Sequence, residues 1–463
     1  MNNLVLRDYQ QDIYDKIRIE FRKGHKGVCA VLPCRSGKSY LFAKISEDAC
    51  KKKSHVLILA HRHSLINQHK ELFEELSLNN EYIRIESVFT EVNHLGENGP
   101  VDLIIIDEAH LSGATSYKKV CEYYNCLRIL LTGSPARLDG KPLDLADSMV
   151  VGISANELIK RGQISDYDYY APNINLDLSN VTKTCGDYNN KELEQAVNKP
   201  TIYGDIIKYY KELGQGRQAL AYCINIQHSK DICDLFNNNG ISARHIDSKT
   251  PEKEREQVMQ DFKDNKFTIL CNCNLISEGI TLPNASVGLL LRPTLSLPLF
   301  IQQSCRVLTP IEGKKAIIID YVNNVQKHGL PTQDRDWSLK EKVKEYDNEN
   351  EDGTFKLRIC QNCFGTYEAK EKICPYCGAE YERTEFEIQN IKNIELKKIE
   401  AAREEKKRQY LSSVAEKVKN YTSPKECKTW AEMTEYAKKM GFKSGYAYIM
   451  AKQNGLFIPR RKK

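Results

Sequence analysis

The segment Ala30–Tyr40, AVLPCRSGKSY, decides the fold because it joins an apolar run to an amphipathic one through a short polar turn. We interpret it as a strand, a turn and the first residues of a helix, which is the arrangement of a phosphate-binding loop. Backbone N–H groups at the start of such a helix face the phosphates of a nucleotide. Lys38 would reach the β and γ phosphate oxygens, and the Ser39 hydroxyl would coordinate Mg²⁺. The segment therefore predicts an ATP site.

Two residues make this turn unusual. Leu32 stands where a glycine is expected five residues before Gly37, and the bulky Arg35 lies inside the turn. The GKS sequence alone is therefore also compatible with a surface strand–turn–helix that binds no phosphate. On the phosphate-loop interpretation, the residues at the nucleotide are Cys34, Arg35, Ser36, Gly37, Lys38 and Ser39.

A second motif, LIIIDEAH at residues 103–110, supports the phosphate loop. Asp107 and Glu108 follow an apolar run that is typical of a buried strand. Carboxylates at this end of a strand hold Mg²⁺ and the attacking water in P-loop enzymes. We expect Asp107 to hold the metal through water, and Glu108 to orient and deprotonate the hydrolytic water. An acidic pair that merely begins a solvated loop is the alternative, which the upstream GKS sequence disfavours.

Nine apolar runs alternate with amphipathic helical stretches through the first 330 residues. They are residues 27–33, 55–61, 101–109, 127–133, 218–224, 243–247, 267–273, 285–292 and 315–322. Near-continuous apolar strands separated by helices indicate parallel sheets that are covered on both faces. The pattern occurs twice, so we expect an α/β fold with a first domain at 1–150, a connector at 151–200 and a second domain at 201–345. The cleft between the two domains is the expected ligand site.

A compact cysteine cluster lies in the next predicted unit, residues 354–382. Its spacing is Cys360-x₂-Cys363-x₁₀-Cys374-x₂-Cys377. Two CxxC pairs in one short unit predict tetrahedral Zn²⁺ coordination by four thiolates. Four protein ligands leave no open position, so we expect a structural ion and not a catalytic one. A redox pair is the lesser alternative, because it does not explain four cysteines.

The last unit, residues 383–463, is basic. It contains twenty Lys and Arg against ten Asp and Glu, a balance of +10, whereas the whole chain carries +6. Such an excess favours contact with a polyanion, and the tyrosines and Trp430 among the lysines could stack on bases. A solvated charge-rich helix, or a small helical module whose aromatic residues form its own core, is the alternative reading.

Composition is typical of a globular protein in a reducing compartment. The sixteen cysteines are mostly scattered singly through apolar segments, which suits free thiols better than a disulfide scaffold. No apolar run approaches the ~20 residues that span a bilayer, and the N-terminus lacks the apolar core of a secretory signal. We therefore expect a cytoplasmic protein, in the host cytoplasm if the source is viral.

Taken together, the motifs resemble superfamily 2 helicases of the DEAH type over roughly residues 6–330. This resemblance implies two tandem RecA-like domains. LRDYQ, residues 6–10, is similar to the adenine-sensing element, which makes Arg7 and Gln10 nucleotide contacts. LTGSPARLDG, residues 131–140, is similar to the segment that couples the domains, which assigns coupling roles to Thr132 and Ser134; His110 of the DEAH motif is expected to share this role.

Further segments resemble family motifs in the same order. LILAHRHSLINQ (57–68) and LAYCINIQHSKDI (220–232) are similar to the elements that contact nucleic acid. NLISEGITLP (274–283) resembles the ATP-sensing element, with Glu278 and Gly279 as matches. FIQQSCRVLTP (300–310) lies where the family writes Q-x-x-G-R-x-x-R, so Gln302 and Arg306 would face the nucleotide from the second domain.

That last motif departs from the family pattern. Cys305 replaces the glycine and Thr309 replaces the second arginine. In the family both arginines approach the γ-phosphate, and loss of one such finger costs ~10³-fold or more in analogous enzymes. We expect Arg306 to suffice as the catalytic arginine; the alternative is a slow or partner-dependent ATPase.

The family also explains the unusual turn. Its loop is written A-x-x-G-x-G-K-S/T, so Leu32 is no anomaly and Arg35 stands at the middle glycine. We expect an arginine there only if the backbone angle suits it without strain.

The chain is similar to bacterial RadD-type and related bacteriophage helicases with a C-terminal four-cysteine zinc ribbon. This resemblance implies an ATP-, Mg²⁺- and Zn²⁺-dependent DNA helicase or translocase that acts on single-stranded, forked or branched DNA, together with replication or repair proteins and no membrane. The alternatives are a nucleotide-dependent DNA clamp or recruitment module with little turnover, and an RNA helicase.

Overall fold

A computed structural model gives the fold of the chain. It describes residues 4–78, 80–113, 115–135, 137, 141–172, 178, 180–184, 187–197, 200–273, 282–339, 346, 348, 350, 355–381, 405, 408–443 and 445–456. Two compact units divide the chain. The first contains residues 1–348 and 356–381, and the second contains residues 349–355 and 382–463.

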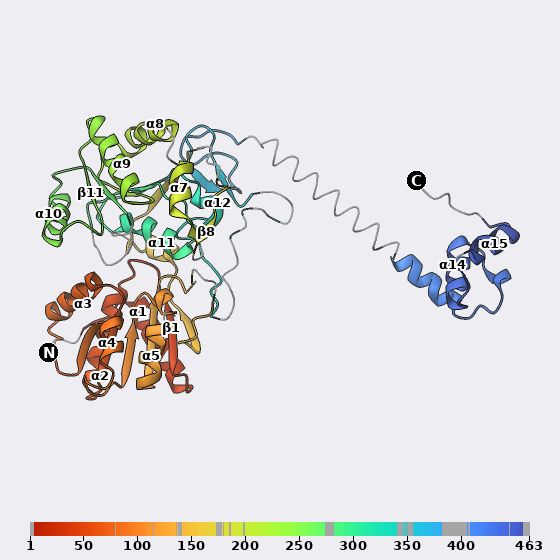
Figure 1. Ribbon diagram of the computed structural model, residues 1–463, viewed down its shortest axis with the longest axis horizontal. Coiled ribbons are helices and arrows are strands. Elements are labelled where there is room, and N and C mark those ends of the chain that lie inside the picture. Colours follow the sequence, from red (N-terminus) through yellow and green to blue (C-terminus); the bar gives the residue numbers. More distant parts are fainter. Residues whose placement is uncertain are drawn as a thin grey trace. The chain divides into compact units, whose positions relative to one another are not determined.

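The first domain is a six-stranded parallel sheet between two layers of helices, drawn in red and orange in Figure 1. Its strands follow the order β3-β2-β4-β5-β1-β6, and they are β1 Gly27–Val31, β2 Val56–Ala60, β3 Ile83–Ser87, β4 Leu103–Ile106, β5 Leu127–Thr132 and β6 Ser148–Val151. The helices are α1 Asp8–Arg22, α2 Lys38–Cys50, α3 His63–Glu75, α4 Val88–Asn93, η1 Ala109–Leu111, α5 Thr115–Tyr124 and α6 Ala155–Lys160. Strands β1, β2 and β4 are buried along their whole length, as their uninterrupted apolar runs predict.

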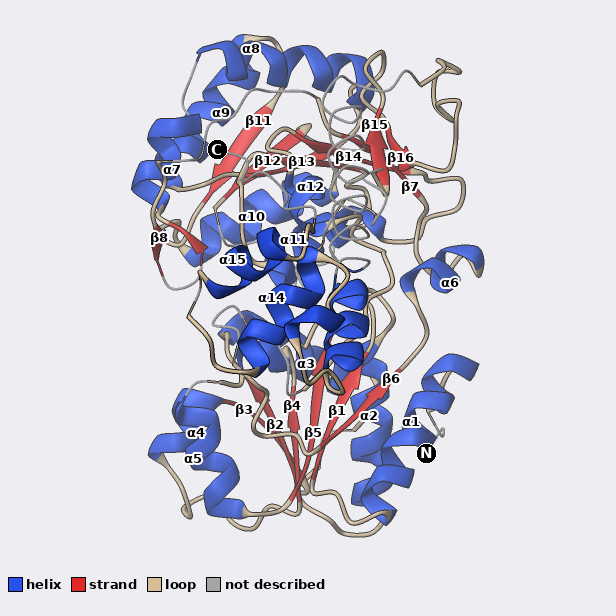
Figure 2. Cartoon of the chain, turned by 90° about the vertical axis from the view of Figure 1, so that its right-hand side faces the viewer, coloured by secondary structure: helices blue, strands red, loops and turns tan. Residues whose placement is uncertain are grey.

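The second domain repeats this architecture with the strand order β11-β12-β10-β13-β14-β7. Its strands are β7 Tyr167–Tyr170, β10 Ala219–Tyr222, β11 Ala243–Ile246, β12 Ile269–Asn272, β13 Val287–Leu290 and β14 Ala316–Asp320. The helices are α7 Asn190–Val197, α8 Pro200–Tyr209, η2 Tyr210–Gly214, α9 Ile226–Asn238, α10 Glu252–Lys263, α11 Leu297–Cys305, η3 Arg306–Leu308 and α12 Asn324–His328. A short antiparallel pair, β8 Lys183–Thr184 and β9 Asp187–Tyr188, precedes α7. The two sheets are the red fans of Figure 2 and confirm the predicted fold class.

The cysteine-rich segment packs on the second sheet. Its hairpin, β15 Leu357–Ile359 and β16 Thr366–Glu368, lies next to the edge strand β7. The Ala171 N–H donates to the Phe364 carbonyl at 2.9 Å, and the rings of Phe364 and Tyr209 lie 5.3 Å apart. This segment is therefore part of the same compact unit as the two sheets.

The second unit is a small helical module with a core of its own. Its described elements are η4 Pro424–Glu426, α14 Trp430–Lys439 and α15 Tyr446–Gln453, and residues 408–418 are also helical. Met433 and Tyr436 are buried in this core, and Trp430 is half-buried against it. Tyr448, in contrast, is 53% exposed. Some aromatic residues of the tail, Trp430 among them, therefore pack in or against the core of the module, whereas others, such as Tyr448, lie on its surface.

Candidate active site

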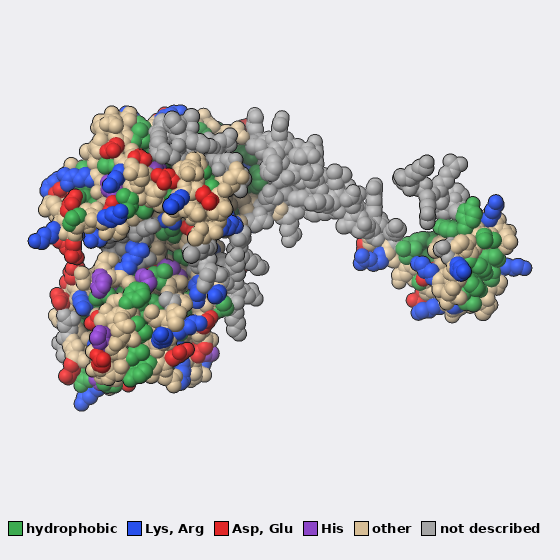
Figure 3. Space-filling view, in the orientation of Figure 1, with side chains coloured by type: hydrophobic (Ala, Val, Ile, Leu, Met, Phe, Trp, Pro, Cys, Tyr) green, Lys and Arg blue, Asp and Glu red, His purple; other side chains and the backbone are tan. Residues whose placement is uncertain are grey.

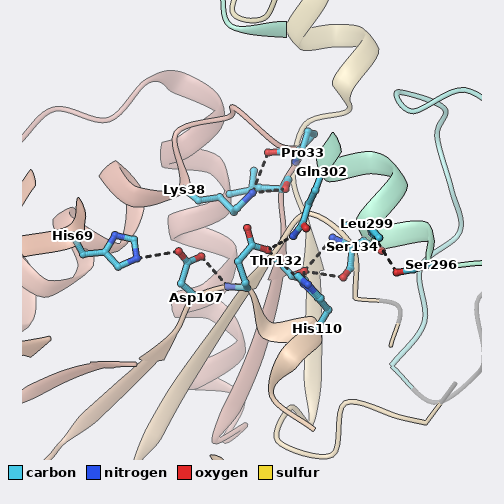
Figure 4. Close-up of polar contacts among 12 residues, drawn as sticks. Pro33, Lys38, His69, Asp107, His110, Thr132, Ser134, Ser296, Leu299 and Gln302 are labelled. Carbon is cyan, nitrogen blue, oxygen red and sulfur yellow. Dashed lines mark hydrogen bonds and ion pairs between the residues drawn. The ribbon is translucent and has the colours of Figure 1, made fainter. Parts of the chain in front are cut away.

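The turn after β1 has the geometry of a phosphate loop. Gly37 has a left-handed backbone with φ 79°, and α2 begins at the next residue, Lys38. The Lys38 ammonium folds back to the carbonyls of Leu32 and Pro33, at 3.5 and 3.4 Å (Figure 4). These carbonyls hold the ammonium at the mouth of the loop, beside the helix N-terminus that attracts anions.

Arg35 does not satisfy the expectation of an unstrained backbone. Its φ is 66°, in the left-handed region that a side chain makes costly by about 1–2 kcal/mol. A glycine adopts this angle freely, which explains the glycine of the family pattern at this position. The expectation was wrong because the turn, and not the side chain, sets the angle.

The helix before β1 braces the loop. Gln10 donates through Nε2 to the carbonyls of Ser36 and Gly37, at 3.1 and 3.2 Å, and the Tyr9 hydroxyl donates to the Ser36 carbonyl at 3.1 Å. The Arg7 N–H in turn donates to Oε1 of Gln10. A Cβ on Gly37 would lie 2.5 Å from Gln10 Nε2 and would displace that amide, and the φ of 79° itself favours a glycine. The structure thus places Gln10 against the phosphate loop, whereas Arg7, among the described residues, is connected to the loop only through Gln10 and Tyr9, and neither Arg7 nor Gln10 lines the cavity described below.

The two acidic residues lie at the carboxyl end of β4. The buried carboxylate of Asp107 accepts from His69 Nε2 at 3.0 Å, and its other oxygen accepts from the Glu108 N–H at 2.9 Å. Burial is the largest single influence and acts to raise the pKa of Asp107, but the contacts with His69, the charge of Lys38 and the hydrogen bond from the Glu108 N–H together outweigh it and lower that pKa below its ordinary value. Asp107 is therefore ionised near neutral pH. His69, on α3, was not among the residues expected from the sequence.

A chain of polar contacts leads from Glu108 toward the second domain, and Figure 4 labels four of its members, His110, Thr132, Ser134 and Gln302. His110 Nδ1 lies 3.4 Å from the Glu108 carboxylate and 3.5 Å from the Thr132 hydroxyl. Thr132 donates to the Ser134 carbonyl at 2.7 Å, and Gln302 of α11 donates to Glu108 at 3.4 Å. The residues with predicted coupling roles thus contact one another directly.

One cavity unites these elements. It has a volume of about 470 Å³ and is lined from the first domain by the loop, α2, α3 and the acidic pair, and from the second domain by Gln302, Cys305 and Arg306. Arg35 crosses it and donates through Nη2 to the Arg306 carbonyl at 3.2 Å. Of the predicted nucleotide contacts, Glu278 and Gly279 lie outside the described residues.

The electrostatics of the cavity suit an anion. Burial acts to lower the pKa of Lys38, but the facing charges of Cys34, Glu108 and Asp107 raise it above its ordinary value. Burial and the neighbouring Arg306 lower the pKa of Arg35 to about 10, which leaves it charged near neutral pH. Three cations therefore line one small space, and carboxylates lie beside them.

The four predicted zinc ligands converge. The sulfur atoms of Cys360, Cys363, Cys374 and Cys377 all lie within 4.8 Å of one another. The Cys360–Cys377 and Cys363–Cys374 sulfur distances are both 3.7 Å, close to the ~3.8 Å edge of a tetrahedron with Zn–S bonds of ~2.3 Å. The donor set and its spacing thus fit a closed tetrahedral zinc site.

Within the part of the chain that the structure describes, no helix is both long and apolar enough to cross a membrane.

Two family models match the chain. The model described as type III restriction enzyme, res subunit, matches residues 3–137, and the helicase conserved C-terminal domain matches residues 199–309. The 51.5 kDa protein of a Lactococcus phage is 34% identical over 75% of this chain and 77% of its own length. IRC3 of Saccharomyces cerevisiae, provisionally named an ATP-dependent helicase, is 30% identical over 69% of this chain. The chain spans only about half, 51%, of that yeast protein.

A solved structure shares the fold. The ATP-dependent type ISP restriction-modification enzyme LlaBIII, solved bound to DNA, superposes with a TM-score of 0.50 over 68% of this chain and 27% of that enzyme, at 18% sequence identity.

Proposed function

Because this chain belongs to the superfamily 2 ATP-dependent helicases, we propose that it couples ATP hydrolysis in the cleft to movement along DNA, or to remodelling of DNA. The observation that carries the proposal is the 470 Å³ cavity, in which the phosphate loop and the acidic pair of one domain face Arg306 of the other. A nucleotide bound there would contact both domains, so binding and hydrolysis would change how tightly the domains close.

Each side chain has a role in this proposal. Lys38 binds the β and γ phosphates, and the loop N–H groups hold the phosphate chain. Ser39 and Asp107 would hold Mg²⁺, which neutralises phosphate charge when it is bound. Glu108 accepts the proton of the attacking water, and Arg306 stabilises the charge that develops on the transferred phosphoryl group.

The polar chain beyond Glu108 offers a route for coupling. Gln302 contacts Glu108 from the second domain, and His110 contacts both Glu108 and Thr132. A change at the hydrolysing carboxylate would therefore alter contacts that hold the two domains together. We assign the coupling roles of His110, Thr132 and Ser134 on this basis.

The proposed substrate is DNA. The similar restriction-modification enzyme was solved bound to DNA, and the basic tail carries twenty Lys and Arg against ten acidic residues. In the second unit, lysines share the surface with exposed apolar side chains (Figure 3), among them Phe442 at 42% and Tyr448 at 53% exposure. Lysines neutralise phosphates and exposed aromatic rings stack on bases, so we assign this module to nucleic-acid binding.

We further propose that the chain is of the DEAH type, closest to RadD-type and related phage helicases, with a structural zinc ion in the cysteine cluster. Its proposed division is a first RecA-like domain at 1–150, a connector at 151–200 that includes the edge strand β7 of the second sheet, a second RecA-like domain at 201–345, a zinc ribbon at 354–382 and the basic tail at 383–463. The sulfur geometry supports the zinc ribbon, and the DEAH sequence at the end of β4 supports the subtype.

The test is the ATPase rate with matched single-stranded, forked and branched DNA and with RNA of the same sequence. We expect DNA to raise the rate several-fold and RNA to raise it less, with the stimulation falling steeply as salt increases. Stronger stimulation by RNA would instead identify an RNA helicase. ATP-dependent DNA binding without turnover would identify a clamp.

A further inference from the structure

Two cysteines face each other across the nucleotide cavity, one from each domain. Cys34 belongs to the phosphate loop and Cys305 ends α11; both are free thiols, and both line the cavity. Their sequence neighbours are in direct contact, because Arg35 Nη2 donates to the Arg306 carbonyl at 3.2 Å. Cys34 packs against the core cluster that contains Cys305, so the two thiols are close neighbours at one end of the cavity.

The two thiols differ in their surroundings. The contact with Cys305 outweighs burial and, together with the positive charges of Lys38 and Arg306, lowers the pKa of Cys34 to about 6. For Cys305, the contact with Cys34 and burial both raise the pKa of the thiol. The thiolate is the reactive form of cysteine, so Cys34 is the nucleophile of the pair and Cys305 is the thiol beside it.

We propose that Cys34 and Cys305 form a redox-modification site, at which a hydroperoxide that enters the nucleotide cavity converts the pair into a disulfide across the cleft. The bond fixes the first domain to the second at the phosphate loop and removes space that the phosphates need. The resulting loss of turnover rests on the proposed ATPase function, whereas formation of the disulfide does not.

The reaction balances in two steps. The Cys34 thiolate attacks one peroxide oxygen; an S–O bond forms, the O–O bond breaks, and the leaving oxygen takes a proton to become water or an alcohol. The Cys34 sulfur is thereby oxidised by two electrons to a sulfenic acid, and the peroxide is reduced. The Cys305 thiol then gives up its proton and attacks the Cys34 sulfur; the S–S bond forms, the S–O bond breaks, and water leaves.

A second thiol pair provides an internal comparison. Cys233 of α9 and Cys271 of β12 also lie on two elements that pack together, but both are within the hydrophobic core of the second domain. Neither lines the nucleotide cavity. A peroxide that reaches the cavity therefore meets the Cys34–Cys305 pair first.

The experiment treats the full-length protein with hydrogen peroxide and maps disulfides by mass spectrometry of non-reduced peptides. We expect a linked Cys34–Cys305 peptide to appear before any Cys233–Cys271 peptide, and ATPase activity to fall at least tenfold in step with it. Dithiothreitol should reverse both changes. A non-hydrolysable ATP analogue should slow the linkage, because it fills the cavity.

The control is Cys305→Ala, which should form no linked peptide and whose ATPase should resist reversible inactivation. Oxidation of Cys34 to sulfinic acid without a linked peptide, or no oxidation of the pair, would overturn the proposal. A Cys34–Cys305 disulfide with unchanged ATPase activity would contradict the proposal that the bond removes the space that the phosphates need. Because the peptide map needs no turnover, a wild-type protein without ATPase activity would contradict the proposed function and leave the disulfide test intact.

Discussion

Arg35 of the phosphate loop donates a hydrogen bond to the backbone carbonyl of Arg306, 3.2 Å away on the opposite domain. The contact joins the two halves of the cavity through a residue whose φ of 66° would suit a glycine. The left-handed backbone of Arg35 costs free energy, and its side chain contacts the other domain. Substitutions at Arg35 can therefore separate the role of the side chain from that of the loop backbone.

The first prediction concerns Arg35→Gly. Backbone N–H groups and Lys38 bind the phosphates, so we expect the dissociation constant for ATP to change by no more than about threefold. Glycine also relieves about 1 kcal/mol of backbone strain. Arg35→Ala is the matched control, because it removes the same contact but keeps the strain. Loss of ATP binding in both variants, measured by fluorescent-nucleotide titration, would show instead that Arg35 is a phosphate ligand.

The second prediction concerns Thr309→Arg. The Thr309 carbonyl accepts from Ser165 and Lys314, and the Thr309 side chain is not among the described groups that line the cavity. We therefore expect the steady-state ATPase rate to change by less than about threefold, whereas Arg306→Ala should lower it ~10³-fold. A large rise in Thr309→Arg would mean that the wild-type chain is a slow switch and not an efficient motor.

The third prediction concerns pH. The His69 hydrogen bond lowers the pKa of Asp107 against its burial, so the ionised carboxylate persists above that lowered pKa and is lost only as the pH falls through it. His69→Ala removes a hydrogen bond that opposes the effect of burial, so the pKa of Asp107 rises. We expect the acid limb of the kcat–pH profile to move up by about 1–2 pH units.

Two variants control this pH measurement. His69→Gln keeps a side-chain donor and should move the acid limb less than His69→Ala does. His94→Ala removes an exposed histidine that is paired with Glu97 and should not move it. An unmoved acid limb in His69→Ala would contradict the role of His69.

The fourth prediction concerns the metal. We expect one zinc ion per purified chain by elemental analysis, and its loss in Cys363→Ser, because three thiolates bind zinc far more weakly than four. Cys126→Ser is the matched control, since Cys126 lies outside the cysteine cluster. Full zinc content in Cys363→Ser, or none in the wild type, would contradict the assignment.

In the two six-stranded sheets, the sequence predicted nine of the twelve strands and missed three. These are β3, β6 and β7, and each lies at the edge of its sheet. An edge strand is only partly covered, so it carries polar and charged residues, as in IRIES of β3 and YDYY of β7. β3 and β7 therefore lack a continuous aliphatic run, and β6, SMVV, is apolar but only four residues long.

The site residues that belong to short contiguous motifs could be predicted from the sequence. Lys38 and Asp107 belong to short contiguous motifs at strand ends, and the parallel sheet brings such ends together. His69 directly follows the segment LILAHRHSLINQ, whose resemblance points to nucleic-acid contacts and not to Asp107, so only the fold places His69 against Asp107. The Cys34–Cys305 contact likewise depends on how the two domains meet, which no local pattern encodes.

The measurement that tests the central claim most directly is the rate of ATP hydrolysis with and without single-stranded DNA, for the wild type, Lys38→Ala and Lys51→Ala. Lys51 lies at the opposite end of α2, where it pairs with Glu47, and should behave as the wild type does. We predict DNA-stimulated hydrolysis that Lys38→Ala lowers by about hundredfold or more. Hydrolysis that DNA does not stimulate, or that survives Lys38→Ala unchanged, would contradict the account.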